Sequence, residues 1–277
     1  MESVIVFGGS LGIGKIIAVY FLEKGCKVTV FARTKNNLES LRDEVEKRGM
    51  YVNILSGNVG SIKEVKKGFE KHYKIYGSYP SFIISTAGIQ GVLGPAWTLS
   101  QDDFEEVIKV NLTGSFNISK TAIEILIKER ISGSIILFSG GGSCNSRPNF
   151  SSYGVSKTGV LRLVETIADE LKSNDHGEII INAVAPGAVK TRMTEEVLSS
   201  KEKSGDKAYE EAFETMESGG TEPGDIIRLV EFLCNREMNK GISGRLIHFR
   251  DEYKKFADVH TSAVYSDAGK LRRIKLI

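Results

Sequence analysis

Tyr153 and Lys157 stand four residues apart, directly after a stretch rich in serine and glycine, "SGGGSCNSRPNFSS". On a helix, residues at i and i+4 lie on the same face, so this spacing brings an ammonium group beside a phenol. A neighbouring positive charge lowers the pKa of a phenol from its usual value of about 10. We therefore expect Tyr153 to act as a general acid or base near neutral pH.

The spacing alone does not identify a catalytic pair, because Tyr20 and Lys24 share it. Tyr20 lies inside an expected helix, where an aromatic side chain more simply packs into the core. Tyr153 instead follows two serines, either of which could cap a new helix, and a loop that leaves an expected strand at 133–140. Ligands of parallel sheets bind at the carboxyl ends of the strands, and this position favours chemistry at Tyr153.

A second candidate site lies near the amino terminus, in "VFGGSLGIGK". Gly8, Gly12 and Gly14 fall between an apolar strand and an amphipathic helix. Glycines at such a turn let the backbone approach a phosphate, which then sits on the helix amino terminus. The setting predicts a dinucleotide site.

The residues after the second expected strand indicate which dinucleotide binds. Where a carboxylate would hold the ribose 2′-hydroxyl of NAD, the chain has Ala32 and Arg33, followed by Thr34 and Lys35. A guanidinium fork suits a 2′-phosphate. We expect NADP(H) to be preferred over NAD(H); the alternative is a solvated arginine at a helix start.

Composition excludes several classes of protein. The 277 residues carry a net charge of +2, which gives no electrostatic case for nucleic acid or an anionic membrane. The three cysteines suit free thiols, and the four histidines have no metal-ligand spacing. No signal peptide and no apolar run of about 18 residues is present. We predict a cytoplasmic protein that needs no metal.

Short apolar runs alternate with amphipathic stretches, which indicates an α/β fold: a doubly wound, Rossmann-type parallel sheet in three layers, forming a single domain over 1–277. The polar segment 190–222 is expected to be either a substrate lid or a surface helical insertion, and 250–277 a carboxyl-terminal extension. The expected strands are 3–8, 27–33, 51–59, 81–88, 133–140, 178–187 and 243–249. The expected helices are 13–25, 36–49, 61–76, 151–172 and 225–235, with 102–130 as one long helix or a broken pair.

"GGSLGIG", "NVG", "STAG", "VNLTGSFN", "ILFSGGG", "SSYGVSK" and "NAVAPGAVKTR" occur in this order. Together they resemble the compact single-domain branch of the short-chain dehydrogenases/reductases over about residues 3–249. The resemblance implies that Tyr153 donates and accepts the proton, that Lys157 lowers its pKa and holds the nicotinamide ribose, and that Asn111 supports a water-linked proton relay. It also implies a cofactor site formed by Gly8, Ser10, Gly12, Ile13, Gly14, Arg33, Asn58, Val59, Ala87, Gly88, Tyr153, Lys157, Pro186, Gly187, Val189 and Thr191.

The sequence departs from the family pattern at four places. Asn58 stands where aspartate is commoner, Phe7 replaces a threonine, and "STAG" replaces "NNAG". The substrate-orienting serine of the family usually lies thirteen residues before the tyrosine, where this chain has Gly140. We favour Ser139 for that role because it ends a strand. The alternatives are Ser143, or no serine, with backbone N–H groups or Asn145 instead.

The resemblance implies an NADP(H)-dependent oxidoreductase that moves a hydride between nicotinamide and a carbonyl or secondary alcohol. The segments "PNFSSYGVSK" and "GISGRLI" resemble a bacterial branch linked to surface carbohydrates, and a 3-oxoacyl substrate is the other candidate. The alternative function is an inactive NADP-binding scaffold or sensor, which Gly140 favours. A homodimer or homotetramer is expected.

Overall fold

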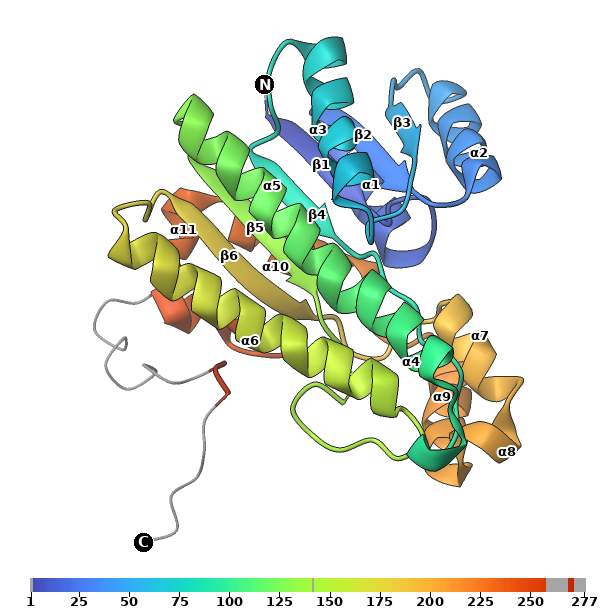
Figure 1. The fold of residues 1–277 in the computed structure, drawn as a ribbon. Helices are drawn as coiled ribbons and strands as arrows, with labels where there is room; N and C mark the ends of the chain where they lie inside the picture. The colour runs from blue at the N-terminus through green and yellow to red at the C-terminus, as the bar shows by residue number, and fades with distance from the viewer. Residues whose placement is uncertain (1, 141, 258–268, 272–277) are drawn as a thin grey trace, which may run out of the picture.

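A computed structural model describes residues 2–140, 142–257 and 269–271. One seven-stranded sheet runs through it in the order β3-β2-β1-β4-β5-β6-β7, with every neighbouring pair parallel (Figure 1). The fold is thus the doubly wound α/β sheet that the sequence predicts. Its strands are β1 Ser3–Phe7, β2 Lys27–Ala32, β3 Asn53–Ser56, β4 Phe82–Ser85, β5 Gly133–Phe138, β6 Ile179–Ala185 and β7 Leu246–His248.

Side chains alternate across the sheet because successive strand residues point to opposite faces. In β1, Val4 and Val6 join one apolar cluster, whereas Ile5 and Phe7 join the other. Helices α1 Gly12–Glu23, α2 Lys35–Glu46 and α10 Pro223–Cys234 contribute to the first cluster. The second, in front in Figure 1, is covered by α3 Ile62–Tyr76, α5 Gly114–Glu129 and α6 Ser151–Ser173.

Each expected strand is longer than the observed one. The stretch 102–130 is a broken pair, one of its two expected forms: α4 Gln101–Val107, a π-helical turn Ile108–Thr113 and α5. Helix α6 begins at Ser151 and its amino-terminal cap is Phe150, with no side-chain cap, so the expected serine cap is wrong. Segment 190–222, expected as a lid or a helical insertion, holds three helices, α7 Arg192–Leu198, α8 Lys201–Ser204 and α9 Asp206–Ser218.

The carboxyl-terminal region adds short elements, α11 Arg236–Asn239 and a 3-10 turn Tyr253–Ala257. Most of the expected extension lies outside the described residues. Where the chain is described again, the carbonyl of Gly269 accepts a hydrogen bond from the Leu246 N–H of β7. Among the residues described, no helix is both long and apolar enough to cross a membrane.

A buried histidine ties the first three strands to α3. His72 is fully buried, with Nε2 at 2.6 Å from the Ser3 hydroxyl and Nδ1 at 2.8 Å from the Thr29 hydroxyl. Asn53 of β3 donates to the same Thr29 hydroxyl at 2.9 Å. Burial lowers the pKa of His72 from 6.5 to about 4, so the ring is neutral in the folded protein at neutral pH.

This pKa shift predicts a loss of stability in acid. Between pH 6.5 and about 4 the unfolded chain protonates His72 and the folded chain does not. The free energy of unfolding is expected to fall with decreasing pH over this window, by about 1.4 kcal/mol per pH unit from this residue. Urea unfolding of wild type and His72→Gln at several pH values checks it: the variant is expected to show the shallower dependence. Equal slopes would contradict the assignment.

Candidate active site

A cavity of about 660 Å³ opens at the carboxyl ends of the strands. Its wall is formed by the turn after β1, the ends of β2, β4 and β5, the start of α6, and helices α7 and α9. It lies at the switch point of the sheet, where β1 pairs with both β2 and β4. The two sites predicted from sequence therefore share one cavity, of a size typical for ligand pockets.

The glycine turn is built by close backbone packing. A Cβ on Gly14 would lie 2.4 Å from the Gly8 carbonyl oxygen and from the Thr86 hydroxyl, and a Cβ on Gly8 would lie 2.6 Å from the Ala87 nitrogen. Gly12, at φ +52°, has only a methyl of Thr191 nearby, at 3.6 Å from an added Cβ. The turn is thus tight on its protein side and open toward the cavity, as a phosphate-binding turn must be.

Two departures from the family pattern have structural reasons. Phe7 is fully buried and packs against Phe31 and Phe69, with ring centroids at 5.1 and 5.7 Å. The Thr86 hydroxyl of "STAG" donates to the carbonyls of Phe7 and Gly8 at 3.3 and 3.2 Å. Thr86 therefore holds the glycine turn from the neighbouring strand.

The end of the cavity beyond β2 carries Arg33 and Asn58. Arg33 is exposed and takes part in no ion pair with another described residue. The δ-oxygen of Asn58 accepts the Gly60 N–H at 2.8 Å, and its backbone N–H donates to Glu64 at 2.8 Å. These contacts fix the Asn58 side chain at the start of the turn before α3.

The expected proton-transfer group lies at the other end. The Lys157 Nζ is 5.6 Å from the Tyr153 ring centroid and donates to the Phe138 carbonyl at 2.9 Å. Asn111, fully buried in the π-helical turn, binds the backbone of Ile89 through both its oxygen and its nitrogen, each at 2.9 Å. The same nitrogen donates to the Ser156 hydroxyl on α6 at 2.9 Å. π-Helical turns are frequent at functional sites.

The side chains of Asn111 and Lys157 both lie against Gly88. A Cβ there would lie 3.2 Å from the Asn111 δ-oxygen and 3.3 Å from the Lys157 Nζ. Ala87 and Gly88 thus bring the end of β4 against both predicted site residues.

The phenol differs from expectation in its pKa. Burial raises the pKa of Tyr153 to about 12, although the guanidinium of Arg147 opposes the shift. Burial also lowers the pKa of Lys157 to about 8. Removal from water therefore dominates the pKa of the phenol, and the charge that opposes it is that of Arg147 rather than that of Lys157. The phenol is accordingly protonated at neutral pH.

A side chain at Gly140 would displace the Tyr153 phenol. A Cβ there would lie 2.5 Å from the Tyr153 hydroxyl oxygen. Ser139 lines the cavity and its hydroxyl donates to the Lys157 carbonyl at 3.4 Å. Ser143 is also buried but lies outside the cavity wall, with Thr158 donating to its carbonyl at 2.9 Å. The choice of serine stays a prediction.

The loop after β6 completes the wall. Pro186, Gly187, Val189 and Thr191 all line the cavity. Gly187 has φ +73°, and a Cβ there would lie 2.4 Å from the Phe249 ring. Thr221 donates to the Ala188 carbonyl at 2.6 Å, so the two ends of the 190–222 segment are tied together.

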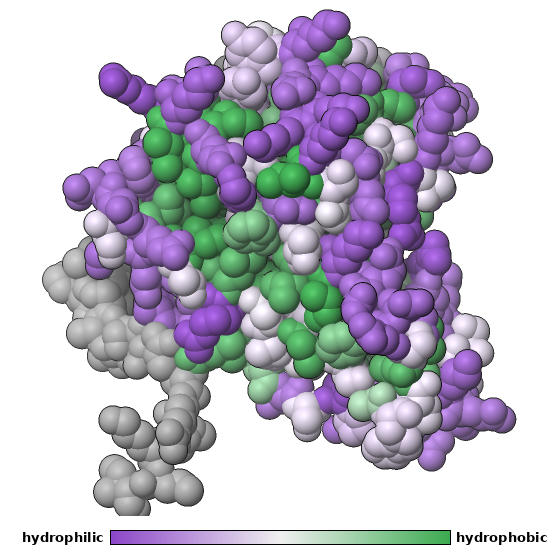
Figure 2. Space-filling view, in the orientation of Figure 1, coloured by the Kyte–Doolittle hydropathy of each residue, from purple (hydrophilic) through white to green (hydrophobic). Residues whose placement is uncertain are grey.

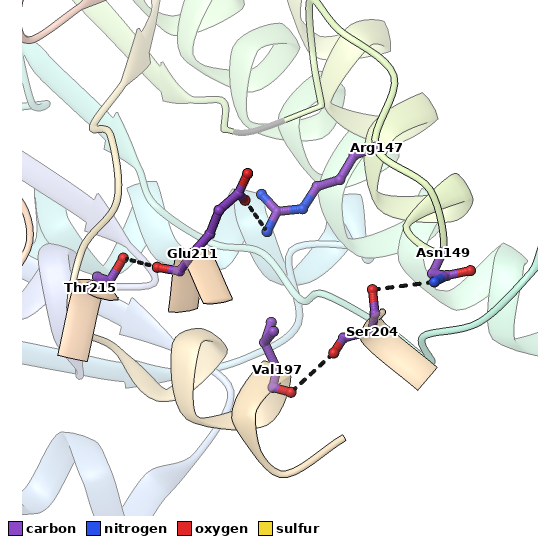
Figure 3. A network of polar contacts seen from close by, with 6 residues as sticks. All are labelled: Arg147, Asn149, Val197, Ser204, Glu211 and Thr215. Atoms are coloured by element: carbon purple, nitrogen blue, oxygen red, sulfur yellow. Dashed lines mark hydrogen bonds and ion pairs between the residues drawn. The ribbon is translucent and has the colours of Figure 1, made fainter. Parts of the chain in front are cut away.

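The charged wall residues that sequence reasoning missed include Arg147 and Glu211. Arg147 comes from the loop before α6 and Glu211 from α9, and they point toward each other in Figure 3. The Arg147 Nη2 lies 3.3 Å from the Glu211 carboxylate. Nearby, Asn149 donates to the Ser204 carbonyl at 3.2 Å. The one available signal was an arginine six positions before Tyr153 in an otherwise uncharged loop.

The second tyrosine–lysine pair lies away from the cavity. Tyr20 packs against the core cluster on α1, with its ring centroid 5.3 Å from that of Phe21. Lys24 lies over the same ring at 5.4 Å. This pair is structural, as its helical setting predicts.

A glycine turn between β1 and α1, at the switch point of a parallel sheet, defines a dinucleotide-binding α/β protein. The family model "short chain dehydrogenase" matches residues 2–202. The chain therefore belongs to the short-chain dehydrogenases/reductases, a family of oxidoreductases.

Curated relatives agree with this assignment. The 3-oxoacyl-(acyl-carrier-protein) reductase FabG of Thermotoga maritima is 31% identical over 246 residues, covering 88% of this chain and 94% of the relative. That of Staphylococcus epidermidis is 31% identical over 250 residues, covering 89% and 96%. The crystal structure of an actinorhodin polyketide ketoreductase variant with NADPH aligns with a TM-score of 0.79 at 25% identity, covering 89% and 95%.

Proposed function

We propose that the protein is an NADP(H)-dependent ketone reductase in which Tyr153 gives the proton and nicotinamide gives the hydride. The observation that carries the proposal is the common cavity: the phosphate-type turn, the half-buried Tyr153 and the buried Lys157 line the same space. When bound, the nicotinamide supplies the hydride chemistry. Its carrier would be held by the glycine turn, Arg33 and the loop 186–191.

The chain's own residues have separate tasks in this proposal. Tyr153, whose pKa of about 12 keeps it protonated, donates to the carbonyl oxygen as the alkoxide develops. Lys157 holds the ribose and faces the phenol's ring. Asn111 fixes the backbone of Ile89 against α6 and supports the proton path. Ser139, the serine that lines the cavity, orients the carbonyl.

The substrate proposed is a 3-oxoacyl-type ketone, with a carbohydrate-pathway ketone as the other candidate. The names of the two FabG relatives support the first. A test is NADPH oxidation with methyl acetoacetate and with keto sugars. Turnover of the ester supports the proposal, whereas NADPH binding without turnover of any ketone would favour the inactive scaffold. The three free cysteines support a reducing, cytoplasmic compartment.

Cofactor preference is predicted to depend on Arg33. Arg33→Ala is expected to weaken NADPH binding by about tenfold or more, equivalent to about 1.4 kcal/mol, and to leave NADH binding unchanged, because only NADPH carries the 2′-phosphate. Titration followed by nicotinamide fluorescence measures both. Lys35→Ala is the control, since Lys35 is exposed and lies 3.6 Å from Glu39. Tighter binding of NADH than of NADPH by the wild type would contradict the prediction.

We also infer a homodimer or homotetramer that pairs through α5 and α6. Phe116 on α5 and Val155 on α6 are 45% and 53% exposed, and apolar side chains gather over these helices in Figure 2. Phe116→Glu combined with Val155→Glu is expected to yield monomers in sedimentation velocity, because charge at an apolar interface is costly. Phe213→Glu, on α9 and 52% exposed, is expected to keep the assembly. An unchanged assembly in the double variant would refute the interface.

A further inference from the structure

The cavity holds a cation close to Tyr153 that the proposed proton and hydride transfers do not use. Arg147 stacks on Phe150, with its Cζ 4.4 Å from the ring centroid. Phe150 is buried in a small apolar cluster with Leu93, Val197 and Ala212, beneath the 190–222 helices. This contact fixes the guanidinium against an apolar wall. The Tyr153 side chain packs against the same cluster, so the guanidinium and the phenol lie close together, and the charge of Arg147 lowers the pKa of the phenol.

The Arg147 guanidinium has more N–H donors than the described part of the chain supplies with acceptors. It carries five N–H groups, and a carboxylate matches two of them at once. Glu211 approaches a single nitrogen, at 3.3 Å, and its side chain is 50% exposed. The Arg147 Nε is buried and has no hydrogen-bond partner in the described part of the chain. Buried donors without acceptors are rare in folded proteins, and the buried Nε is out of reach of a ligand, so an oxyanion would bind the terminal nitrogens that Glu211 now approaches.

The remaining cations of the cavity have other positions or partners. Lys157 donates to the Phe138 carbonyl. Arg192 is paired with Glu196 at 2.9 Å, and its side chain is 75% exposed. Arg33 lies at the opposite end, beyond β2. Arg147 is therefore the cation placed to meet a substrate whose carbonyl lies at Tyr153.

We propose that Arg147 binds a carboxylate carried by the ketone substrate, which makes the preferred substrates oxo acids. This inference rests on the proposed ketone reduction and narrows its substrate to ketones with a free carboxylate, of which the 3-oxo acids share the carbon skeleton of the 3-oxoacyl esters. The bound carboxylate takes the fork of Arg147, and Glu211 turns toward solvent. Because the two carboxylates repel each other, Glu211 limits binding of the acid and favours release of the product.

The test measures NADPH-dependent reduction of three oxo acids, pyruvate, acetoacetate and levulinate, and of the methyl ester of each. Methyl esters keep the ketone and remove the charge, so the ratio of kcat/KM for acid over ester isolates the contribution of the anion. The wild type is expected to favour the acid by about tenfold or more in at least one pair. Wild type that treats acid and ester alike in all pairs would overturn the proposal.

Variants distinguish anion binding by Arg147 from a purely structural role, in which the Arg147–Glu211 ion pair only joins the loop before α6 to α9. Arg147→Gln is expected to reduce the ratio to about one, and Arg147→Lys to keep part of it, because a lysine retains the charge without the fork. Glu211→Gln breaks the same ion pair but is expected to raise the ratio. Arg192→Gln, which removes an exposed cation from the same rim, is expected to keep it. An acid-over-ester ratio that is unchanged in Arg147→Gln would refute anion binding by Arg147. So would a ratio that falls equally in Arg147→Gln and Glu211→Gln, because loss of the ion pair alone would then explain both.

Binding measurements distinguish this failure from failure of the proposed function. Quenching of bound NADPH fluorescence by the three acids does not require turnover. Binding of an acid that is lost in Arg147→Gln, without turnover of any ketone, would keep the anion site and reject the reductase. Turnover of ketones without dependence on Arg147 would keep the reductase and reject the anion site.

Discussion

Tyr153→Phe is expected to lower kcat for ketone reduction by about 10²- to 10⁴-fold, the range typical for loss of a general acid. The substitution removes one hydroxyl and keeps the ring that contacts the small apolar cluster beneath the 190–222 helices. Because burial keeps the phenol protonated, the loss is expected across the whole neutral range of pH. The measurement is steady-state NADPH oxidation with methyl acetoacetate.

The control for this variant is its affinity for NADPH. The glycine turn and Arg33 are untouched, so fluorescence titration is expected to give a Kd close to that of the wild type. Tyr20→Phe, which alters the other tyrosine–lysine pair, is expected to keep full activity because that pair lies in the core cluster on α1. Undiminished turnover in Tyr153→Phe would show that another group donates the proton.

Gly140→Ser is expected to lower kcat/KM by about 10²-fold, although it places a serine at the family's usual position. The new Cβ would lie 2.5 Å from the Tyr153 hydroxyl oxygen, so the phenol must move away from its present place. A displacement of about 1 Å at a reacting group can cost 10²-fold in rate. The melting temperature is expected to change little, because the displaced atom is the end of a side chain. The measurement is kcat/KM together with thermal unfolding.

Gly154→Ala provides a matched control. It adds a methyl group next to Tyr153, yet the new Cβ would meet only the Gly142 carbonyl, at an ordinary 3.5 Å. Activity close to that of the wild type is expected. Equal or higher activity in Gly140→Ser would show that the loop accommodates a serine and that the steric argument is wrong.

The sequence predicts the sheet well because its strands are continuous apolar runs, such as "SVIVF" in β1, which only a parallel sheet covered on both faces buries. It predicts the helices of 190–222 poorly. Helix α9 contributes mainly small apolar residues to the core, Ala208 and Ala212, so its apolar face gives little periodic signal.

Within the site, the positions of residues were more predictable than their electrostatics. Tyr153, Lys157 and the glycines follow from spacing and from the strand ends they succeed. The high pKa of Tyr153 depends on burial, which arises from the loop before α6 and the helices above it. The pairing of Arg147 with Glu211 joins segments far apart in the chain, and no local pattern encodes it. His72 with Ser3 and Thr29 is of the same kind.

The central claim is that nicotinamide gives a hydride to a ketone while Tyr153 gives the proton. The most direct test uses NADPH with deuterium in place of both hydrogens at nicotinamide C4, together with methyl acetoacetate. Wild type is expected to form methyl hydroxybutyrate with one deuterium on the carbinol carbon, seen by mass spectrometry. Tyr153→Phe is expected to form little product while it binds the labelled cofactor normally. Product without deuterium, or equal product from the variant, would contradict the claim.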